Sequence, residues 1–469
     1  MIRVAIIGGG ISGLAAAFAL EDHCRAGAVE YTLYESSPNL GGVLRTEQIQ
    51  GCIVEAGPDS FITEKPWAAD LCRVLGIGDQ LIGSNDADRK TYILVSGRLI
   101  PMPDGLMFLV PTKILPTGLS PLFSWATKLR MAQELFHPPR AAQPDESVAS
   151  LVERHYGAEM VDRLADPLLS GVYGGEAANL SVRAVLPRFA EMERTHGSLG
   201  RAMLAARNKM RRPANQSAPP LFTSLKNGMQ QLVETLIPRL NPSALITNAR
   251  VQSIQPESGG WTVGVHPEER TTGLKSDHFD AVILAVPTHA AAKILSLCSP
   301  ELSAELAAIG YSSSITVGLG YDREVRQCLP PGFGFLVPRS EGKRLLAATF
   351  VHNKFPHRAP EDCALLRCFF AGSNAENIWQ QSNDAIIAAV RNELQHILGL
   401  RAEPLFARVY KWKSAMAQYG VGHLERLDRI ERLRQKLPNL ALAGNGYRGI
   451  GVPDCVRSGT NAAEQVLTR

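Results

Sequence analysis

The chain lacks the patterns that would place it among zinc proteins, disulfide-rich proteins or nucleic-acid-binding proteins. None of its eight cysteines forms a Cys-x-x-Cys pair, so we expect neither a metal site nor a disulfide framework, and we expect reduced thiols. A net charge of only +4 is too small to indicate a nucleic-acid partner. Because 45% of the residues are hydrophobic and 20% are charged, an ordinary globular protein is the expectation.

The sequence also contains little that predicts export or a membrane span. Residues 1–7 run directly into glycines, without the basic and apolar regions of a signal peptide. The most apolar stretch, 105–127, is interrupted by Lys113 and by three prolines, so at most it lies on a bilayer surface. We therefore expect a cytoplasmic protein and leave peripheral attachment to the cytoplasmic membrane open.

Length and hydrophobic patterning predict several domains and an α/β fold. At 469 residues the chain exceeds the roughly 100–200 residues of one domain. Residues 2–7 resemble a buried strand, a helical run follows the glycines, and 31–35 supplies a second strand, which completes a parallel βαβ unit. Apolar spacing is mostly helical between 101 and 206, whereas apolar and polar positions alternate from 312 to 372, as in an antiparallel sheet.

The first motif that carries chemistry is Gly-x-Gly-x-x-Gly at Gly8, Gly10 and Gly13. The first glycine allows a tight turn, the second lets the backbone approach a pyrophosphate, and the third permits close packing of helix on strand. Glu35 ends the next predicted strand, where its carboxylate can accept hydrogen bonds from ribose hydroxyls. A tight turn without a ligand is the alternative, but the position between strand and helix favours a dinucleotide.

Two further segments favour FAD over a nicotinamide dinucleotide. Gly41 and Gly42 followed by Arg45 repeat the diglycine and basic residue of flavin oxidases, with a solvated loop as the alternative. Glycines from 444 to 451 precede Pro453, which has no amide to lose in the first turn of a helix. The positive end of that helix can face the N1 and C2 carbonyl of a flavin, where negative charge accumulates on reduction. A glycine turn with a structural role is the alternative.

Several segments taken together resemble the protoporphyrinogen oxidase family, within the larger FAD amine-oxidase-like group. In chain order they are 55–61, 167–175 with Leu180 and Ser181, 224–229, 415–419 with Gly422 and His423, and 443–455. Each is weak alone, but their order and spacing cover nearly the whole chain. The resemblance implies removal of six hydrogens from a porphyrinogen in haem biosynthesis, with non-covalent FAD, dioxygen as acceptor and peroxide as product.

The resemblance also implies the domain organisation. The expected fold is α/β (α+β overall), with a Rossmann-type FAD-binding domain, a mixed-sheet substrate-binding domain and a helical membrane-facing domain. The implied limits are 1–64 with 222–294 and 436–469 for FAD, 65–91 with 205–221 and 295–435 for substrate, and 92–204 for the helical domain. A homodimer is left open.

An apolar strip within 105–127 is the candidate membrane contact. It comprises Leu106, Met107, Phe108, Leu109, Leu119, Leu122, Phe123 and Trp125. Either these residues lie among lipid headgroups, with nearby cations at the phosphates, or they pack internally. The sequence does not show which face is exposed, so both interpretations stay open.

The resemblance extends to individual site residues. For FAD it implies Gly8, Gly10, Ile11, Ser12, Gly13, Glu35, Ser36, Gly42, Arg45, Gly57, Pro58, Asp59, Ser60, Val251, Trp412, Gly444, Gly451, Val452 and Pro453. For the substrate it implies main-chain carbonyls at Ser170 and Gly171, pocket walls at Leu336 and Phe369, and a propionate contact at Arg89, with Lys90 as its rival. No side chain is assigned as a general base, because orientation does most of the catalysis in such a reaction.

Three functions remain open from the sequence. The leading one is oxidation of protoporphyrinogen IX or coproporphyrinogen III, which differ in the number of carboxylates that the protein must accept. A flavin amine oxidase or carotenoid desaturase is the second, although residues 451–454 are Gly-Val-Pro-Asp where amine oxidases show an aromatic residue. A non-catalytic porphyrin-binding flavoprotein is the third, and the full set of flavin motifs argues against it.

Overall fold

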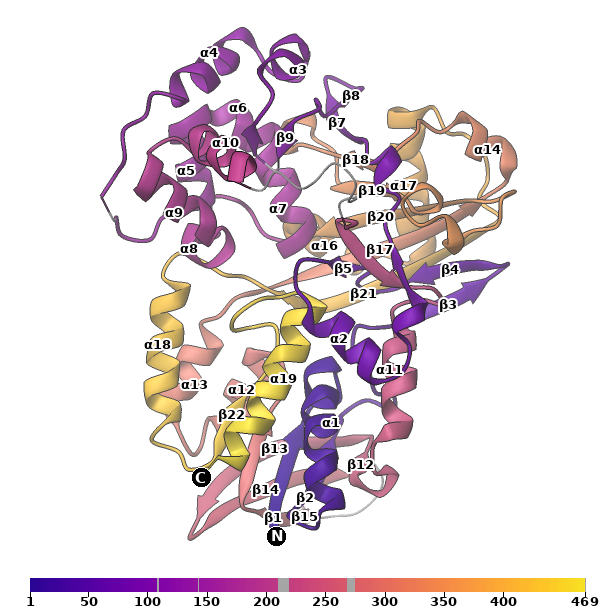
Figure 1. Ribbon diagram of the computed structural model, residues 1–469. Coiled ribbons are helices and arrows are strands. Elements are labelled where there is room, and N and C mark those ends of the chain that lie inside the picture. Colours follow the sequence, from indigo (N-terminus) through magenta and orange to yellow (C-terminus); the bar gives the residue numbers. More distant parts are fainter. Residues whose placement is uncertain (108, 142, 210–218, 268–274, 469) are drawn as a thin grey trace.

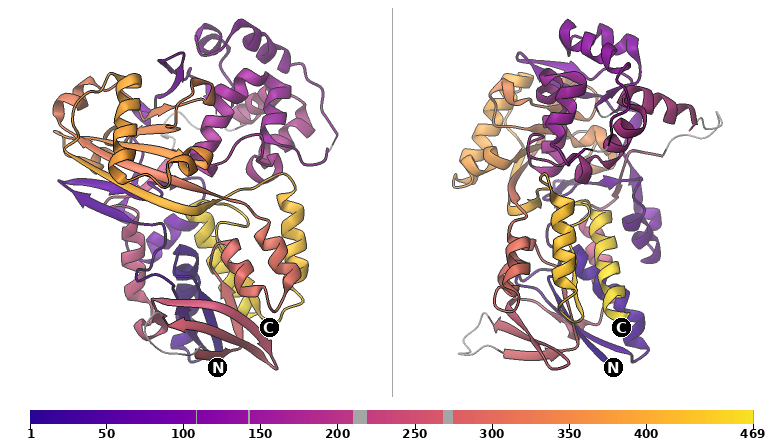
Figure 2. Two further views of the ribbon diagram at one scale, coloured as in Figure 1. Left: turned by 180° about the vertical axis from the view of Figure 1, so that it is seen from behind. Right: turned by 90° about the vertical axis from the view of Figure 1, so that its left-hand side faces the viewer.

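The computed structural model describes residues 1–107, 109–141, 143–209, 219–267 and 275–468. In Figure 1 the part that contains both termini lies below, and two lobes lie above it: a block of helices on one side and a sheet with long strands on the other. The two views in Figure 2 show the same arrangement from other directions. Phe108 of the apolar strip lies outside the described residues.

A five-stranded parallel sheet forms the centre of the lower part, and it confirms the predicted Rossmann-type unit. Its strands, in spatial order, are β12 (Leu245–Ile246), β2 (Val29–Tyr34), β1 (Ile2–Ile7), β16 (Ala281–Leu284) and β22 (Leu440–Leu442), and each neighbouring pair is parallel. Both faces of the sheet are covered, so residues 4–7 of β1 and the whole of β16 are continuous apolar runs rather than alternating ones. Three distant parts of the chain supply these strands.

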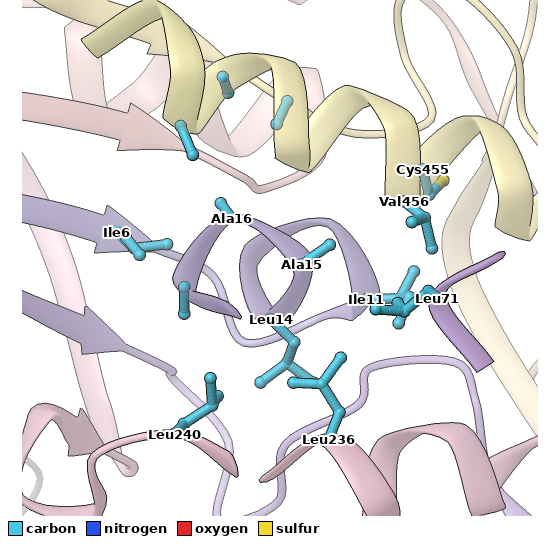
Figure 3. Packing of buried hydrophobic residues seen from close by; sticks show 14 of the residues in the cluster. Ile6, Ile11, Leu14, Ala15, Ala16, Leu71, Leu236, Leu240, Cys455 and Val456 are labelled. Carbon is cyan, nitrogen blue, oxygen red and sulfur yellow. The ribbon is translucent and has the colours of Figure 1, made fainter. Parts of the chain in front are cut away.

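Helices α1 (Ile11–Arg25) and α19 (Val452–Leu467) pack tightly on this sheet. A Cβ added to Gly459 would lie 2.0 Å from the carbonyl oxygen of Ser12, so only glycine permits the approach of the two helices there. In Figure 3, Val456 of α19 points toward Ile11, and Leu14 points to the other side, toward Leu236. Since each helix follows a parallel strand, both helix N-termini lie at the carboxyl edge of the sheet.

A small antiparallel sheet covers one side of the parallel sheet. It consists of β13 (Ala249–Glu257), β14 (Gly260–Pro267) and β15 (Lys275–Phe279). The sequence pattern predicts one strand over 245–254, but the structure has two, β12 and β13. Asn248 between them has φ +53°, a left-handed conformation that ends the first strand and turns the chain into a different sheet.

The upper lobe with long strands contains a mixed seven-stranded sheet. Its spatial order is β21 (Phe406–Ala417), β17 (Tyr311–Tyr321), β20 (Ala364–Ala371), β19 (Ala347–Phe350), β18 (Gly334–Leu336), β7 (Thr91–Val95) and β8 (Arg98–Pro101). Only β18 and β7 pair in parallel. Leu366, Cys368 and Phe370 pack with helix α17 (Asn383–Leu398) in one apolar cluster. The strand alternation therefore directs Arg367 and Phe369 to the opposite face, toward the lower part.

The helical lobe has its own apolar core. Its helices are α3 (Ile114–Leu119), α4 (Trp125–Glu134), α5 (Val148–Tyr156), α6 (Ala158–Met160), α7 (Asp166–Tyr173), α8 (Val182–Val185), α9 (Pro187–His196) and α10 (Leu199–Lys209). Leu109, Leu122 and Phe123 of the apolar strip are buried in this core, so internal packing is the correct interpretation for them. Leu119 and Trp125 are 76% and 79% exposed. No helix among the described residues is long and apolar enough to cross a bilayer.

Candidate cofactor and substrate site

The turn between β1 and α1 requires the glycines of the first motif. Gly8 has φ +110°, and a Cβ there would lie 2.4 Å from the carbonyl oxygen of Ala285. A Cβ on Gly13 would lie 1.8 Å from the carbonyl oxygen of Gly8. Both positions therefore exclude any larger residue for steric reasons within the protein itself.

Gly10 is different, because it borders open space. A Cβ built on Gly10 would meet no described atom within 4 Å, and Gly42, with φ +60°, lies against the Cα of Gly10. Gly10 is also the N-cap of α1, and no side chain caps the helix there. The first amides of α1, including those of Ile11 and Ser12, are thus left to an anionic group, and the residues fit the pyrophosphate of FAD.

Glu35 is fixed at the tip of β2, beside this turn. Its carboxylate accepts hydrogen bonds from the backbone N–H of Gly9 and of Ser37, each at 2.7 Å, and from the Ser36 hydroxyl at 3.3 Å. Its carbonyl oxygen accepts a hydrogen bond from Ala249, which begins β13. Two residues further on, Val251 is 7% exposed, so β13 holds it near the end of β2 where the resemblance expects the cofactor.

The predicted cofactor residue Arg45 is not held in place by close contacts. Its side chain is 61% exposed, and its guanidinium lies 3.8 Å from the Glu47 carboxylate. Residues 46–49 form β3 (Thr46–Ile49), which pairs with β4 (Cys52–Glu55) in a hairpin. The Arg45 side chain is therefore largely solvated in this structure, and its contact with FAD stays a prediction.

A buried ion pair joins two of the segments on which the resemblance rests. Arg358 is fully buried, and its Nη1 contacts Oε1 of Glu55 at 2.5 Å. Its Nη2 donates to the Ser224 hydroxyl at 2.6 Å, while Glu55 also accepts from the Met229 N–H at 2.7 Å. Segments 55–61 and 224–229 thus meet around one arginine that the motif analysis did not select.

The loop after β4 carries Gly57, Pro58, Asp59 and Ser60, and cations fix its shape. Lys354 Nζ lies 2.9 Å from Oδ2 of Asp59, and Arg367 donates to the carbonyl oxygen of Gly57 at 2.6 Å. Burial alone would raise the pKa of the Asp59 carboxyl, but Lys354 and Arg367 outweigh it and hold the pKa well below its usual range. Asp59 is therefore a fixed negative charge that orders the loop.

Tyr419 fixes the conformation of the glycine-rich segment before α19. The Tyr419 hydroxyl donates to the Asn445 carbonyl oxygen at 2.7 Å and accepts from the Gly449 N–H at 2.8 Å. Gly444 has φ +130° and donates to the Ser458 hydroxyl at 3.1 Å. These contacts fix both ends of the glycine-rich turn.

The N-terminus of α19 is available to a ligand. Gly451 is the N-cap and no side chain caps it, while Val452 and Pro453 form the buried first turn. The Asp454 carboxylate lies beside this turn, 3.3 Å from a Cβ built on Gly451, and it pairs with Lys65 at 2.6 Å and with Arg457 at 3.4 Å. Because two cations balance this carboxylate, the partial positive charge of the helix N-terminus is not cancelled by it.

The sheet face that is turned toward the cofactor segments carries the two predicted substrate walls, Leu336 and Phe369, in one row. Strand pairing places Leu336 beside Ala347, and Ala347 beside Phe369. Directly paired residues share a face, so the small Ala347 separates two larger apolar side chains. Phe369 belongs to none of the apolar clusters of the described residues. Leu336, by contrast, packs at the margin of the helical-lobe core, so Phe369 is the end of the row that the protein's own apolar packing leaves uncovered.

Trp412 connects this face to the cofactor loop. It lies two residues beyond Tyr410, which stands in the same row as Phe369 through Thr316. The Trp412 indole donates to the carbonyl oxygen of Ala56 at 2.7 Å. Because Ala56 directly precedes Gly57, this hydrogen bond ties β21 to the loop that carries Gly57.

The two predicted main-chain acceptors, the carbonyls of Ser170 and Gly171, differ in whether they already accept a hydrogen bond. Ser170 and Gly171 lie in α7, whose last turns face the sheet, but the Ser170 carbonyl already accepts from Gly174 at 2.9 Å. Among the described hydrogen bonds, none ends on the Gly171 carbonyl oxygen. Ser170 instead lines a cavity of about 150 Å³ together with Ser312, Arg339 and Gln418. Of the two carbonyls, that of Ser170 is therefore the one already engaged within the described residues.

Arg89 is not gathered with the other predicted substrate residues. Its side chain is 50% exposed, and its guanidinium is 3.9 Å from Asp86. Lys90 is exposed as well, and its carbonyl oxygen accepts from Phe333, which ties the segment to β18. Both cations therefore lie at the surface, directly before β7.

Sequence reasoning missed the cations that order the cofactor loop. Arg358, Lys354 and Arg367 occur in no motif, and single basic residues are usually solvated. The one available signal was Arg367, which alternates with Phe369 in a strand whose neighbouring positions are apolar. Burial of Arg358 depends on three chain segments meeting, which spacing along the sequence does not reveal.

Comparisons with known proteins agree with this geometry. The family model described as flavin containing amine oxidoreductase matches residues 11–467. A protein of Bacillus subtilis (strain 168) named coproporphyrinogen III oxidase is 34% identical over 470 residues, covering 99% of this chain and 98% of that protein. Protoporphyrinogen oxidase 2 of Arabidopsis thaliana is 28% identical, over 99% of this chain and 94% of its own length.

A solved crystal structure is also similar to this chain over its full length. A protein of Exiguobacterium sp. 255-15, provisionally named a protoporphyrinogen oxidase, superposes with a TM-score of 0.86 at 29% identity, over 100% of this chain and 99% of its own. The family match spans almost the whole chain, including both helix N-termini of the candidate site. The chain therefore belongs to the flavin containing amine oxidoreductases, and it is an oxidoreductase whose cofactor is FAD.

Proposed function

We propose that the protein oxidises a porphyrinogen, with coproporphyrinogen III as its preferred substrate, to the aromatic porphyrin in haem biosynthesis. The observation that carries the proposal is the full-length likeness to the coproporphyrinogen III oxidase of B. subtilis. The geometry supports it, because an apolar row faces the cofactor segments across the site. A flat macrocycle with polar edges suits such a wall.

Each side chain has a positioning role in this proposal. Leu336 and Phe369 hold the macrocycle on either side of Ala347, and the Gly171 carbonyl accepts a hydrogen bond from a pyrrole N–H. Arg89, or Lys90 in its place, contacts a propionate at the rim. When bound, FAD would supply the two-electron acceptor for each of the three oxidations, with dioxygen as the final acceptor and three molecules of hydrogen peroxide per porphyrin as the by-product. The protein's contribution is orientation, and no side chain acts as a general base.

The cofactor assignment of individual residues is part of the same proposal. Gly10, Gly42 and the α1 amides hold the pyrophosphate, Glu35 the ribose, and Val251 the adenine side. The α19 N-terminus at Gly451 and Val452 faces the flavin. We also propose three domains within the limits expected above, with one change: the hairpin β7–β8 goes with the substrate domain, because β7 pairs with β18.

Parallel turnover of two substrates tests the proposed reaction. Purified protein with FAD is given coproporphyrinogen III or protoporphyrinogen IX, in air and under nitrogen, and porphyrin fluorescence and peroxide are measured. We expect porphyrin only in air, with three peroxides per porphyrin and a higher kcat/KM for coproporphyrinogen III. Preference for protoporphyrinogen IX would contradict the substrate choice, and no turnover of either would contradict the reaction class.

We further propose that the protein is cytoplasmic and attaches to membrane surfaces through an exposed apolar patch on α3 and α4. The patch comprises Leu115, Leu119, Trp125, Leu129 and Phe136, which are 61–83% exposed. Lys128 Nζ lies 4.5 Å from the Trp125 ring, so a cation stands beside the patch for lipid phosphates. This patch replaces Phe123 of the predicted strip, because Phe123 is buried.

Flotation with vesicles containing phosphatidylglycerol tests the patch. The double variant Leu119→Asp with Trp125→Asp should no longer float, because two charges would have to enter the headgroup region. Leu297→Asp is the control, since Leu297 is 74% exposed in the lower part of the molecule. Equal flotation of wild type and the double variant would contradict the patch.

A further inference from the structure

Two buried thiols from distant parts of the chain lie in contact within one apolar cluster. The sulfur atoms of Cys52 and Cys363 are 3.2 Å apart, although 311 residues separate them in the sequence. Cys52 is fully buried and Cys363 is 6% exposed. All eight cysteines are described and free, and this is the only thiol-to-thiol contact among the described residues. The contact is therefore specific to one pair.

Both thiols lie on ordered turns that touch each other. Cys52 follows the β3–β4 turn. In this turn Gly51 has φ +76°, and a Cβ built on Gly51 would lie 3.0 Å from Cγ of Pro360. The Cys363 N–H donates to the Pro360 carbonyl oxygen at 3.0 Å. Arg326 Nη1 donates to the carbonyl oxygens of Pro360 and Cys363 at 2.6 and 2.9 Å. Each sulfur is thus held by a turn that the other turn contacts.

The geometry points to this pair as a redox modification site: we propose that hydrogen peroxide or another two-electron thiol oxidant converts Cys52 and Cys363 into a disulfide. Sulfur atoms in a disulfide are about 2.05 Å apart, so the pair must approach by about 1.2 Å. A hairpin turn allows a shift of that size more easily than a central strand does. The resting protein keeps both thiols reduced.

The reaction proceeds in two balanced steps. The Cys363 thiolate attacks one peroxide oxygen and displaces hydroxide, which leaves as water, so that the sulfur becomes a sulfenic acid. The Cys52 sulfur then attacks the sulfenic sulfur and displaces a second water, which leaves the disulfide. One peroxide is reduced to two waters, and two thiols are oxidised.

The order of attack follows from exposure. Burial raises the pKa of the Cys52 thiol to about 12, so little of it is thiolate at neutral pH. Cys363 is 6% exposed, whereas Cys52 is fully buried, so we expect an oxidant to reach Cys363 first. Oxidation should therefore be slow, over minutes to hours. The peroxide that the proposed reaction releases is one source of oxidant, but the site does not depend on that reaction.

The bridge would tie the cofactor side to the substrate side. Cys52 begins β4, which ends at Glu55 before the cofactor loop, and Cys363 directly precedes β20, which carries Arg367 and Phe369. A crosslink across 311 residues restricts the unfolded chain strongly. We expect the oxidised holoenzyme to unfold at a temperature higher by roughly 5 °C, an effect that a reductant reverses.

Thiol counting and peptide mapping test the site. Holoenzyme is treated with hydrogen peroxide or diamide, denatured without reductant and titrated. We expect eight thiols before treatment and six after it, with one crosslinked peptide pair containing Cys52 and Cys363. Cys363→Ser should abolish the loss of two thiols, whereas Cys72→Ser, at a buried cysteine elsewhere, should retain it.

Three results would overturn the proposal. These are eight free thiols after treatment, a crosslink between other cysteines, and Cys363 oxidised to the sulfinic acid without any bridge. Mapping of the wild-type protein decides among them even if the serine variants fail to fold. Because diamide requires no turnover and no porphyrinogen, failure of this test is distinguishable from failure of the proposed function.

Discussion

The cofactor side and the substrate side of the site are built in different ways. On the cofactor side, backbone approaches leave no room for a Cβ at Gly8 or Gly13, and a fully buried ion pair joins Glu55 to Arg358. On the substrate side, half-buried apolar side chains stand in a row, with Ala347 between Leu336 and Phe369. The first side depends on steric exclusion and charge, and the second on side-chain volume.

This difference teaches where the protein tolerates change. Close backbone contacts and buried charges leave few alternatives, so substitutions there should reduce stability or cofactor affinity. A row of apolar side chains can be altered in size while the sheet remains intact, so substitutions there should change KM and leave the flavin bound. Substitutions on the two sides, and one in the helical lobe that should affect neither side, test the contrast in order from the largest expected effect to the smallest.

Arg358→Met should have the largest effect. It leaves the Glu55 carboxylate buried without its cation, which costs about 3–5 kcal/mol of unfolding free energy. Urea unfolding of the FAD-bound protein measures the loss. Arg25→Met is the control, because its guanidinium is 65% exposed and pairs with an exposed Asp22, an arrangement worth about 0–1 kcal/mol. Equal losses in the two variants would show that the buried pair is not what holds this side together.

Gly10→Ala should weaken FAD binding by about 100-fold, or about 2.7 kcal/mol, and leave the apoprotein folded. The added Cβ meets no described protein atom within 4 Å, so it fills only the space proposed for the pyrophosphate. Titration of apoprotein with FAD, followed by fluorescence, measures the affinity. Gly118→Ala is matched to it, since its Cβ would also meet nothing within 4 Å. Wild-type affinity in Gly10→Ala would remove the pyrophosphate from this turn.

Ala347→Phe should lower kcat/KM for the porphyrinogen about 30-fold, or about 2 kcal/mol, with the flavin spectrum unchanged. The larger ring fills the space between Leu336 and Phe369. Steady-state kinetics with coproporphyrinogen III provide the measurement. Phe369→Ala changes the volume in the opposite direction and should also raise KM. Unchanged kinetics in both variants would exclude this row as the substrate wall.

His155→Gln should alter how the stability of the helical lobe depends on pH. Burial alone would lower the pKa of His155, but hydrogen bonds to Glu134 and Glu193 outweigh it and raise the pKa above its ordinary 6.5. A raised pKa stabilises the fold fully below pH 6.5, and this stabilisation is lost as the pH rises through the folded-state pKa.

We therefore expect the unfolding temperature of the wild type to fall as the pH rises through the folded-state pKa of His155. The His155→Gln variant should be about 1 kcal/mol less stable than the wild type at pH 6. Its unfolding temperature should not show this fall with rising pH. FAD affinity and kcat should change in neither protein, because the lobe is remote from the cofactor glycines. Parallel pH profiles for the two proteins would contradict a charged His155.

Arg89→Ala should have the smallest effect, a rise in KM of about threefold, because a half-exposed cation contributes little through screened contacts. Lys90→Ala measured in parallel identifies which of the two cations contacts a propionate. FAD content provides the control. If neither variant changes KM, the rim does not bind carboxylates at this edge.

The sequence predicted the cofactor side better than the substrate side for a physical reason. The glycines, Glu35 and the α19 start are local patterns, because a turn between a strand and a helix needs them within a few residues. Ala347 stands between Leu336 and Phe369 only through the register of three strands, and register depends on long-range packing. The resemblance to the oxidase family implied Leu336 and Phe369 but not Ala347.

The helical lobe shows the same limit. Prolines interrupt the stretch 105–127, so its helical period is too short to reveal which side is buried. The pattern grouped Phe123 with Trp125, but the structure buries the first and exposes the second. Arg358 escaped detection since its three neighbours come from distant segments.

The strand order of the parallel sheet has a consequence for biosynthesis. β1 lies between β2 and β16, and about 430 residues separate β1 from β22 at the other edge of the sheet. At roughly 5–20 residues per second, a ribosome needs about 20 to 90 s to reach the last strand. The β1 edge of the first βαβ unit stays unpaired until β16 emerges, and the β16 edge then stays unpaired until β22 emerges. Such apolar edges are prone to aggregation. The nascent chain should therefore depend on chaperones until its final strand emerges.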